Sequence, residues 1–166
     1  MSKLYVFDID GTLCSDHFRV GENFVLGIGD TSDTDRAAWL EYLILNNNAY
    51  KDCEPIPAMV EYAESLRQAG ERVFFMSTDR TSFAYRAKHK WLKKQFPNFH
   101  PSFLIVAPQP KGDVIAILAK KYNIPIGDCV LWDDTRSTLV HAAGLGIEVH
   151  HVSEMFSGAF QASGKG

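Results

Sequence analysis

An apolar segment at residues 4–7 leads into two carboxylates one residue apart, Asp8 and Asp10, and a glycine follows at once. A short apolar run of this kind is typical of a strand buried in a parallel sheet, and Gly11 allows a tight turn after it. In open α/β sheets, ligands bind in the crevice beyond the carboxyl ends of the strands. The segment therefore predicts a functional site at Asp8 and Asp10. The alternative is an Asx turn, in which Asp10 only bonds the following backbone.

The rest of the chain alternates amphipathic and apolar segments, which indicates helices and strands in turn. Repeated strand-helix order predicts an α/β fold with a central parallel sheet and right-handed crossovers. The expected helices cover residues 58–69, 82–95, 112–122 and 137–143, and the expected later strands cover residues 72–77, 103–106, 129–132 and 147–152.

The length of 166 residues fits a single domain, 1–166, with enough apolar residues for a full core. The start of the chain has no signal-peptide pattern, and no apolar run approaches membrane-spanning length. We therefore expect a soluble, cytoplasmic protein with no membrane partner. The three cysteines lie far apart without a Cys-x-x-Cys spacing, so they indicate neither a disulfide framework nor a zinc site.

Positive charge is concentrated in one stretch, although the formal net charge is −3. Residues 80–111 contain seven Lys and Arg and no Asp or Glu, which leaves 10 basic against 20 acidic residues elsewhere. A focused positive field suits a phosphorylated substrate or a nucleic-acid backbone. A solvated helix face is the alternative interpretation of such a charge run.

Groups that bind phosphate or cations follow the first four of the predicted strands. Ser77 and Thr78 end the second strand, Lys111 comes after the third, and Asp133 and Asp134 end the fourth. Strand alternation indicates that only one of Ser77 and Thr78 faces the crevice. Together these groups provide what phosphoryl transfer requires: a carboxylate nucleophile, an acid/base, a hydroxyl, an ammonium and further carboxylates for a hard cation.

These residues resemble the four motifs of the haloacid dehalogenase superfamily of phosphohydrolases. The first motif corresponds to Asp8-Ile9-Asp10-Gly11-Thr12, and the others to Thr78, Lys111 and Asp133-Asp134. Within that superfamily the chain is most similar to the 3′-phosphatase domain of bacteriophage-type polynucleotide kinase/phosphatases. The matching segments are Pro57-x-Met59-Val60, Lys88-x-Lys90-Trp91-Leu92, Lys111-Gly112-Asp113-Val114 and Asp133-Asp134-Thr135-Arg136. Thr78-Asp79-Arg80 departs from the Ser-Gly-Arg of that group's second motif.

The resemblance implies a three-layer Rossmann-like fold and a Mg²⁺-dependent phosphomonoesterase. Asp8 would attack phosphorus to form an aspartyl-phosphate, and Asp10 would act as the general acid and base. Thr78 and Lys111 would hold the phosphoryl oxygens. The cation, for which Mn²⁺ is the alternative, would be held by Asp8, Asp133 and the backbone carbonyl of Asp10, with Asp134 either as a further ligand or as a partner of the ligands. The expected substrate-binding residues are Gly11, Thr12, Arg80, Arg86 and Lys90.

A 3′-phosphate on a nucleic-acid end is the substrate that this resemblance implies. The alternatives are a small-molecule 5′- or 3′-nucleotidase and a non-catalytic nucleic-acid-binding protein of the same fold. The chain has no Gly-x-x-x-x-Gly-Lys-Ser/Thr motif. A kinase or ligase acting on the same ends would therefore be a separate partner.

Residues 15–55 separate the first two motifs and are too few for a folded cap domain. We expect a small lid, with a helix at 34–46, inserted after the first strand. Packing of Trp39 and Tyr42 against the sheet is the alternative role for the aromatic residues of that helix. The histidines carry no predicted role.

Overall fold

The structure is a computed structural model, and it describes residues 2–14, 18–20, 23–25, 53–78, 82–107 and 110–157. Most of the predicted lid, 15–55, and its predicted helix, 34–46, lie outside the described residues. Within that range, β2 (Phe18–Val20) pairs antiparallel with β3 (Asn23–Val25). Arg80 also lies outside the described residues. No described helix is long and apolar enough to cross a membrane.

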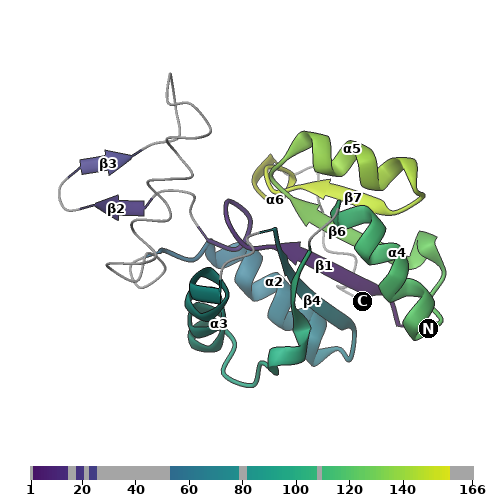
Figure 1. Ribbon diagram of the computed structural model, residues 1–166, viewed down its shortest axis with the longest axis horizontal. Coiled ribbons are helices and arrows are strands. Elements are labelled where there is room, and N and C mark those ends of the chain that lie inside the picture. The colour runs from purple at the N-terminus through teal and green to yellow at the C-terminus, as the bar shows by residue number, and fades with distance from the viewer. Residues whose placement is uncertain are drawn as a thin grey trace.

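A five-stranded parallel sheet forms the centre of the molecule, in the order β5-β4-β1-β6-β7 (Figure 1). This agrees with the α/β fold and the parallel sheet predicted from the sequence. The strands are β1 (Leu4–Asp8), β4 (Arg72–Ser77), β5 (Leu104–Val106), β6 (Cys129–Asp133) and β7 (Glu148–His151).

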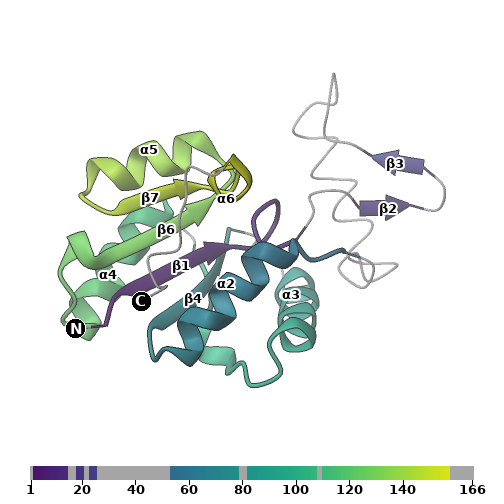
Figure 2. The ribbon, with the colours of Figure 1, turned by 180° about the vertical axis from the view of Figure 1, so that it is seen from behind.

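Four helices cover the two faces of the sheet, and Figures 1 and 2 show α2 and α3 on one side and α4 and α5 on the other. A short α6 and two 3₁₀ turns complete the described elements. The helices are α2 (Pro57–Gln68), α3 (Ser82–Gln95), α4 (Lys111–Tyr122), α5 (Arg136–Gly144) and α6 (Glu154–Ser157), and the 3₁₀ turns are η1 (Pro101–Phe103) and η2 (Ile126–Asp128). Each predicted helix and strand outside the lid agrees with one of these elements to within about two residues.

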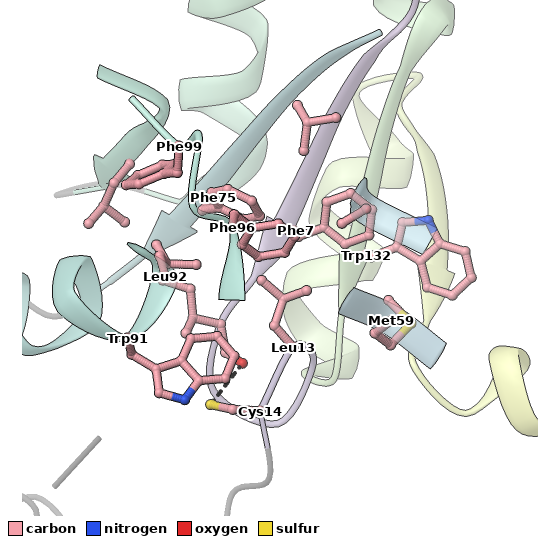
Figure 3. Packing of buried hydrophobic residues seen from close by; sticks show 14 of the residues in the cluster. Phe7, Leu13, Cys14, Met59, Phe75, Trp91, Leu92, Phe96, Phe99 and Trp132 are labelled. Atoms are coloured by element: carbon pink, nitrogen blue, oxygen red, sulfur yellow. Dashed lines mark hydrogen bonds between the residues drawn. The ribbon is translucent and has the colours of Figure 1, made fainter. Parts of the chain in front are cut away.

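Alternation along β1 divides its side chains between two buried clusters. Phe7 packs with the residues of α2 and α3, whereas Leu4 and Val6 pack with those of α4 and α5. In the first cluster, Phe75 of β4 lies beside Phe96, with ring centroids 4.8 Å apart (Figure 3). Burial of apolar area on both faces stabilises the fold by about 25 cal/mol per Å². The sheet is therefore held rigidly between two helical layers.

Strand register brings the ends of β4, β1 and β6 to one edge of the sheet. Asp8 is paired with Met76 of β4, and Phe7 is paired with both Phe75 and Trp132. By alternation from Val6 and Leu131, Asp8 and Asp133 lie on the α4/α5 side of the sheet. Ser77 lies on the other side, with Phe75. The fold thus supplies polar groups to both sides of one edge.

Candidate active site

Three carboxylates gather at this edge of the sheet. Oxygen atoms of Asp8, Asp133 and Asp134 lie within 4.8 Å of one another. Asp8 and Asp133 are buried, and Asp134 is half-buried. Like charges this close repel one another and are costly to bury, so the group needs positive charge beside it.

Lys111 provides part of that charge from the first residue of α4. Its Nζ lies 2.6 Å from Asp8 Oδ1 and 2.7 Å from Asp133 Oδ2, and all three residues are buried. Gly112 allows α4 to approach α5, because a Cβ atom there would lie 3.1 Å from the Cα atom of Ala142. Close packing of these two helices therefore fixes the position of the ammonium group.

Burial and charge act in opposite directions on these groups. Burial raises the pKa of Asp8 well above its usual range, against the lowering effect of Lys111, and Asp133 and Asp10 raise it further. Burial lowers the pKa of Lys111, but Asp8 and Asp133 outweigh it and leave that pKa above its ordinary value. Three carboxylates face one ammonium here, so a cation would bind favourably.

The turn after β1 carries Asp10 and is closed by its own backbone. The N–H of Gly11 donates to the carbonyl of Cys14 at 2.9 Å, and the Leu13 N–H donates to the Ile9 carbonyl at 3.0 Å. Gly11 has a φ of +74°, and a Cβ atom there would lie only 2.3 Å from Asp134 Oδ2. Glycine is therefore required both by the turn and by the carboxylate that lies against it.

Backbone contacts hold the acidic turn after β6. Asp133 Oδ1 accepts a hydrogen bond from the Thr135 N–H at 2.8 Å. Nε2 of His151, on the neighbouring strand β7, lies 3.0 Å from the carbonyl oxygen of Asp134. Nδ1 of the same ring accepts from the Ser153 N–H at 3.1 Å, so Nε2 is the donor to Asp134. Asp133 and Asp134, two of the predicted cation ligands, are thus each held by a hydrogen bond.

Asp10 lies against a second buried lysine. Lys88 of α3 is 3% exposed, and its Nζ lies 3.0 Å from Asp10 Oδ2. The same ammonium donates to the hydroxyl of Ser77 at 2.5 Å. Asp10 itself remains partly accessible, with 30% of its side chain exposed. This group lies on the α3 side of the edge, opposite Lys111.

The other predicted site residues occupy varied positions. Thr12 is buried, with its hydroxyl 3.5 Å from Asp8 Oδ2. Thr78 directly follows β4 and is exposed, whereas Ser77 is buried. Arg86 and Lys90 are exposed on α3. The structure therefore brings together Asp8, Asp10, Gly11, Thr12, Lys111, Asp133 and Asp134.

Sequence reasoning missed Lys88 and His151. Lys88 was counted with the basic charge of residues 80–111, and the histidines were given no role. Lys88 precedes the buried Trp91 and Leu92 by three and four residues, so helical spacing alone places it on the apolar face. For His151 no comparable signal exists, since its neighbour is set by the pairing of β7 with β6.

The donor set suits a hard cation. All three clustered groups offer carboxylate oxygens, which Mg²⁺ prefers, and no described His or Cys is part of the cluster. Asp134 remains half-buried, so the cluster is also open to solvent on one side. Water and substrate oxygens would complete the coordination of such an ion.

Comparison with solved structures relates this arrangement to a known fold. A haloacid dehalogenase hydrolase of family IA from Entamoeba histolytica superposes with a TM-score of 0.61 at 16% identity, over 90% of this chain and 83% of that chain. The chain has the haloacid dehalogenase-like fold. The D,D-heptose 1,7-bisphosphate phosphatase of Burkholderia thailandensis matches with a TM-score of 0.53 at 16% identity, over 88% of this chain and 75% of that chain.

A third similar structure is the N-terminal part of a Bacteroides fragilis protein, which contains a phosphatase domain and was solved in complex with Mg. It matches with a TM-score of 0.53 at 16% identity, over 90% of this chain and 36% of that chain. No family model matches the sequence, and no curated protein matches it. The chain therefore shares its fold with these proteins at a sequence identity of 16%.

Proposed function

We propose that the chain is a phosphomonoester hydrolase that works through an aspartyl-phosphate on Asp8. The observation that carries this proposal is the contact of Lys111 Nζ with both Asp8 and Asp133, at 2.6 and 2.7 Å, inside a cluster of three carboxylates. This arrangement combines a nucleophile, a phosphate-binding ammonium and a cation site within one hydrogen-bond network. The haloacid dehalogenase-like fold agrees with it.

The two acids divide the chemistry between them. An Asp8 oxygen attacks phosphorus, the ester P–O bond breaks, and Asp10 gives a proton to the departing alcohol oxygen. Asp10 then takes a proton from a water molecule that attacks phosphorus, and inorganic phosphate leaves with Asp8 restored. The partial exposure of Asp10, at 30%, supports its access to leaving group and water.

Phosphoryl oxygens would be held by Lys111 and Thr78. Thr78 is the first residue after β4, and continuing the alternation of Phe74 and Met76 by one step would place it on the side of the sheet that faces α4, where Asp8 and Asp133 lie. Ser77 is buried on the opposite side and bonded to Lys88. This difference favours Thr78 over Ser77 as the phosphate-binding hydroxyl.

A Mg²⁺ ion would be held by Asp8, Asp133 and Asp134, with the backbone carbonyl of Asp10 as a further ligand. When bound, such an ion would neutralise charge on the phosphoryl oxygens and orient them. Hydrogen bonds from the Thr135 N–H to Asp133 and from His151 to the carbonyl of Asp134 keep these two residues in place for it.

Nucleic-acid ends carrying a 3′-phosphate are the substrate class that we propose. Three basic side chains, Arg86, Lys90 and Lys94, are exposed on α3 at intervals of four residues, so they lie along one side of the helix. Lys88, on the same helix, contacts Asp10. The exposed basic side chains therefore lie on the helix that also contacts the catalytic turn. A polymer backbone entering the site would meet these charges.

Phosphate release in Mg²⁺ tests both levels of the proposal. The substrates are an oligonucleotide with a 3′-phosphate, the same oligonucleotide with a 5′-phosphate, and 3′- and 5′-mononucleotides, each with the wild type and Asp8→Asn. We expect the 3′-phosphorylated oligonucleotide to be preferred and the variant to be inactive. Preference for a mononucleotide would make the enzyme a nucleotidase, and an active Asp8→Asn variant would overturn the aspartyl-phosphate mechanism.

A double variant tests the role of the basic side of α3. Arg86→Gln with Lys90→Gln should raise KM for the oligonucleotide at least about 10-fold and leave KM for p-nitrophenyl phosphate unchanged, because only a polymer reaches these charges. Lys120→Gln, an exposed lysine on α4, is the control for loss of surface charge. Equal effects on both substrates would exclude α3 as the polymer-binding surface.

A further inference from the structure

Lys88 is buried although it belongs to a strongly basic helix. Among the described residues, Lys88 and Lys111 are the buried lysines, at 3% and 6% exposure. Four other basic residues of α3, Arg86, Lys90, Lys93 and Lys94, are exposed. A buried ammonium is costly unless it is paired and hydrogen-bonded, so a lysine at this position needs a reason beyond solubility.

Two partners of Lys88 lie at or just beyond the ends of two central strands. Its Nζ lies 3.0 Å from Oδ2 of Asp10, in the turn after β1, and 2.5 Å from Oγ of Ser77, the last residue of β4. Contact with Oδ2 restricts rotation of the Asp10 carboxyl group about its Cβ–Cγ bond. The direction of the other oxygen, Oδ1, is then set as well.

The helix that carries Lys88 is itself fixed. Trp91 and Leu92, one turn further on, are buried in the cluster that also contains Leu13 and Cys14 of the catalytic turn (Figure 3). The indole N–H of Trp91 donates to the carbonyl of Cys53 at 2.9 Å. The helix that carries Lys88 and the turn that carries Asp10 are therefore packed into the same buried cluster.

We propose that Lys88 is a positioning residue that holds the Asp10 carboxyl group in the direction needed for proton transfer to the leaving oxygen. This inference rests on the proposed function, in which Asp10 supplies that proton as the ester P–O bond breaks. Proton transfer needs hydrogen-bond distance and alignment, and small displacements of a catalytic group lower the rate strongly. Lys88 acts only through Asp10 and does not contact the phosphoryl group.

Leaving-group chemistry separates this role from a structural one. An alkyl phosphate, such as the 3′-phosphorylated oligonucleotide, needs a proton on its leaving oxygen, whereas the nitrophenolate of p-nitrophenyl phosphate leaves without one. Lys88→Met should lower kcat/KM for the alkyl ester about 10- to 100-fold, part of the 10²- to 10⁴-fold contribution typical of general acid catalysis. This ratio reports only the steps up to departure of the leaving group, so it excludes the later water attack that both esters share. For p-nitrophenyl phosphate we expect less than about 3-fold loss of kcat/KM.

Three further variants complete the experiment. Lys88→Arg keeps a cation at the site and should recover most of the alkyl-ester activity, and Ser77→Ala should show a smaller loss with the same substrate dependence. Lys120→Met on α4 should match the wild type on both esters. If Lys88→Met does not fold, as judged by circular dichroism, the substrate dependence in Ser77→Ala carries the test.

Equal losses of kcat/KM on both esters, in variants that fold, would overturn the positioning role and leave the proposed function intact. A rise in KM for both esters would also overturn it, because it would place Lys88 on the phosphoryl group. A wild type that hydrolyses neither ester would overturn the proposed function and this inference with it.

Discussion

Gly11 is the single residue on which the shape of the acidic cluster depends most. Its positive φ makes the turn after β1, and its missing side chain leaves the space that Asp134 Oδ2 occupies. Two loops far apart in sequence therefore meet at one glycine. Any side chain here would strain the turn and displace a predicted cation ligand.

Gly11→Ala should weaken Mg²⁺ binding at least about 10-fold, as loss of ligand orientation does in metal sites. It should also cost about 1–2 kcal/mol in free energy of unfolding, because a left-handed conformation is unfavourable for alanine. Gly70→Ala is the matched control, since Gly70 has a φ of +83° and open space around its Cα. Calorimetric titration with Mg²⁺ and urea unfolding measure the two effects.

The contrast between the two glycine variants isolates the contact with Asp134. Gly70→Ala should lose a similar amount of stability and retain its Mg²⁺ affinity. If both variants bind Mg²⁺ as the wild type does, the position of Asp134 against Gly11 is unimportant for the ion.

Lys111 is the residue whose removal should destabilise the fold most at the site. Lys111→Met leaves Asp8 and Asp133 buried without their counter-ion, and breaking a buried pair in this way costs about 3–5 kcal/mol. We expect that loss in the free energy of urea unfolding in EDTA, and a smaller loss at saturating Mg²⁺. A loss below about 1 kcal/mol in EDTA would contradict the buried pairing.

At the scale of elements, α3 illustrates what sequence patterns reveal and what they conceal. The helix and its bounds are predicted correctly, because apolar spacing and the absence of proline indicate it directly. A sum of charges over residues 80–111, however, treats Lys88 and Lys90 alike. Helical spacing distinguishes them, since Lys88 shares a face with Trp91 and Leu92.

The pairing of β6 with β7 and the following α6 bring several titratable side chains together beside β7, the outermost strand of the sheet. His150 stacks on Trp132 with centroids 4.7 Å apart, and its ring nitrogens lie 2.7 Å from Glu148 Oε1 and 2.6 Å from Glu154 Oε2. The hydrogen bond with His150 lowers the pKa of Glu148, burial opposes this, and Lys3 lowers the pKa further.

Glu148→Gln should therefore have a pH-dependent effect on stability. A carboxyl whose folded pKa lies below its ordinary value of 4.5 stabilises the fold above that value and loses its effect as pH falls through the folded pKa. The variant should be less stable than the wild type at pH 7 by up to about 1 kcal/mol, the range of solvent-screened pairs. Urea unfolding at pH 7 and pH 3 measures the difference, which should shrink at pH 3. A difference that grows on acidification would contradict the lowered pKa.

At the scale of the whole molecule, sequence alone predicts the strands and helices of the described core and the edge where the acids meet. The sequence predicts that Asp8 and Asp133 share a site, because each ends an apolar strand and strand ends in a parallel sheet share an edge. Contacts that depend on which strands are neighbours were not predictable. His151 reaches the carbonyl of Asp134 only because β7 pairs with β6, and Lys88 reaches Asp10 only because α3 covers β1 and β4 on one face.

Folding brings together carboxylates that an unfolded chain keeps apart, so Mg²⁺ should bind the folded state alone and raise the Tm. At an Mg²⁺ concentration 100 times the Kd, linkage gives about 2.7 kcal/mol of stabilisation. For a chain of this size that corresponds to a shift of about 5–10 °C. Differential scanning calorimetry in EDTA and in Mg²⁺, at constant ionic strength, measures it.

Asp133→Asn combined with Asp134→Asn should abolish this shift, and it should do so without the loss of stability expected for Lys111→Met. The reason is that removing carboxylates relieves the repulsion around Asp8, whereas removing the ammonium leaves that repulsion unbalanced. In EDTA the free energy of unfolding of the double variant should therefore be at least as large as that of Lys111→Met. In Mg²⁺ without EDTA, the double variant should bind the ion more weakly than the wild type. A full Mg²⁺ shift in the double variant would show that the ion binds elsewhere and that Lys111 alone balances Asp8.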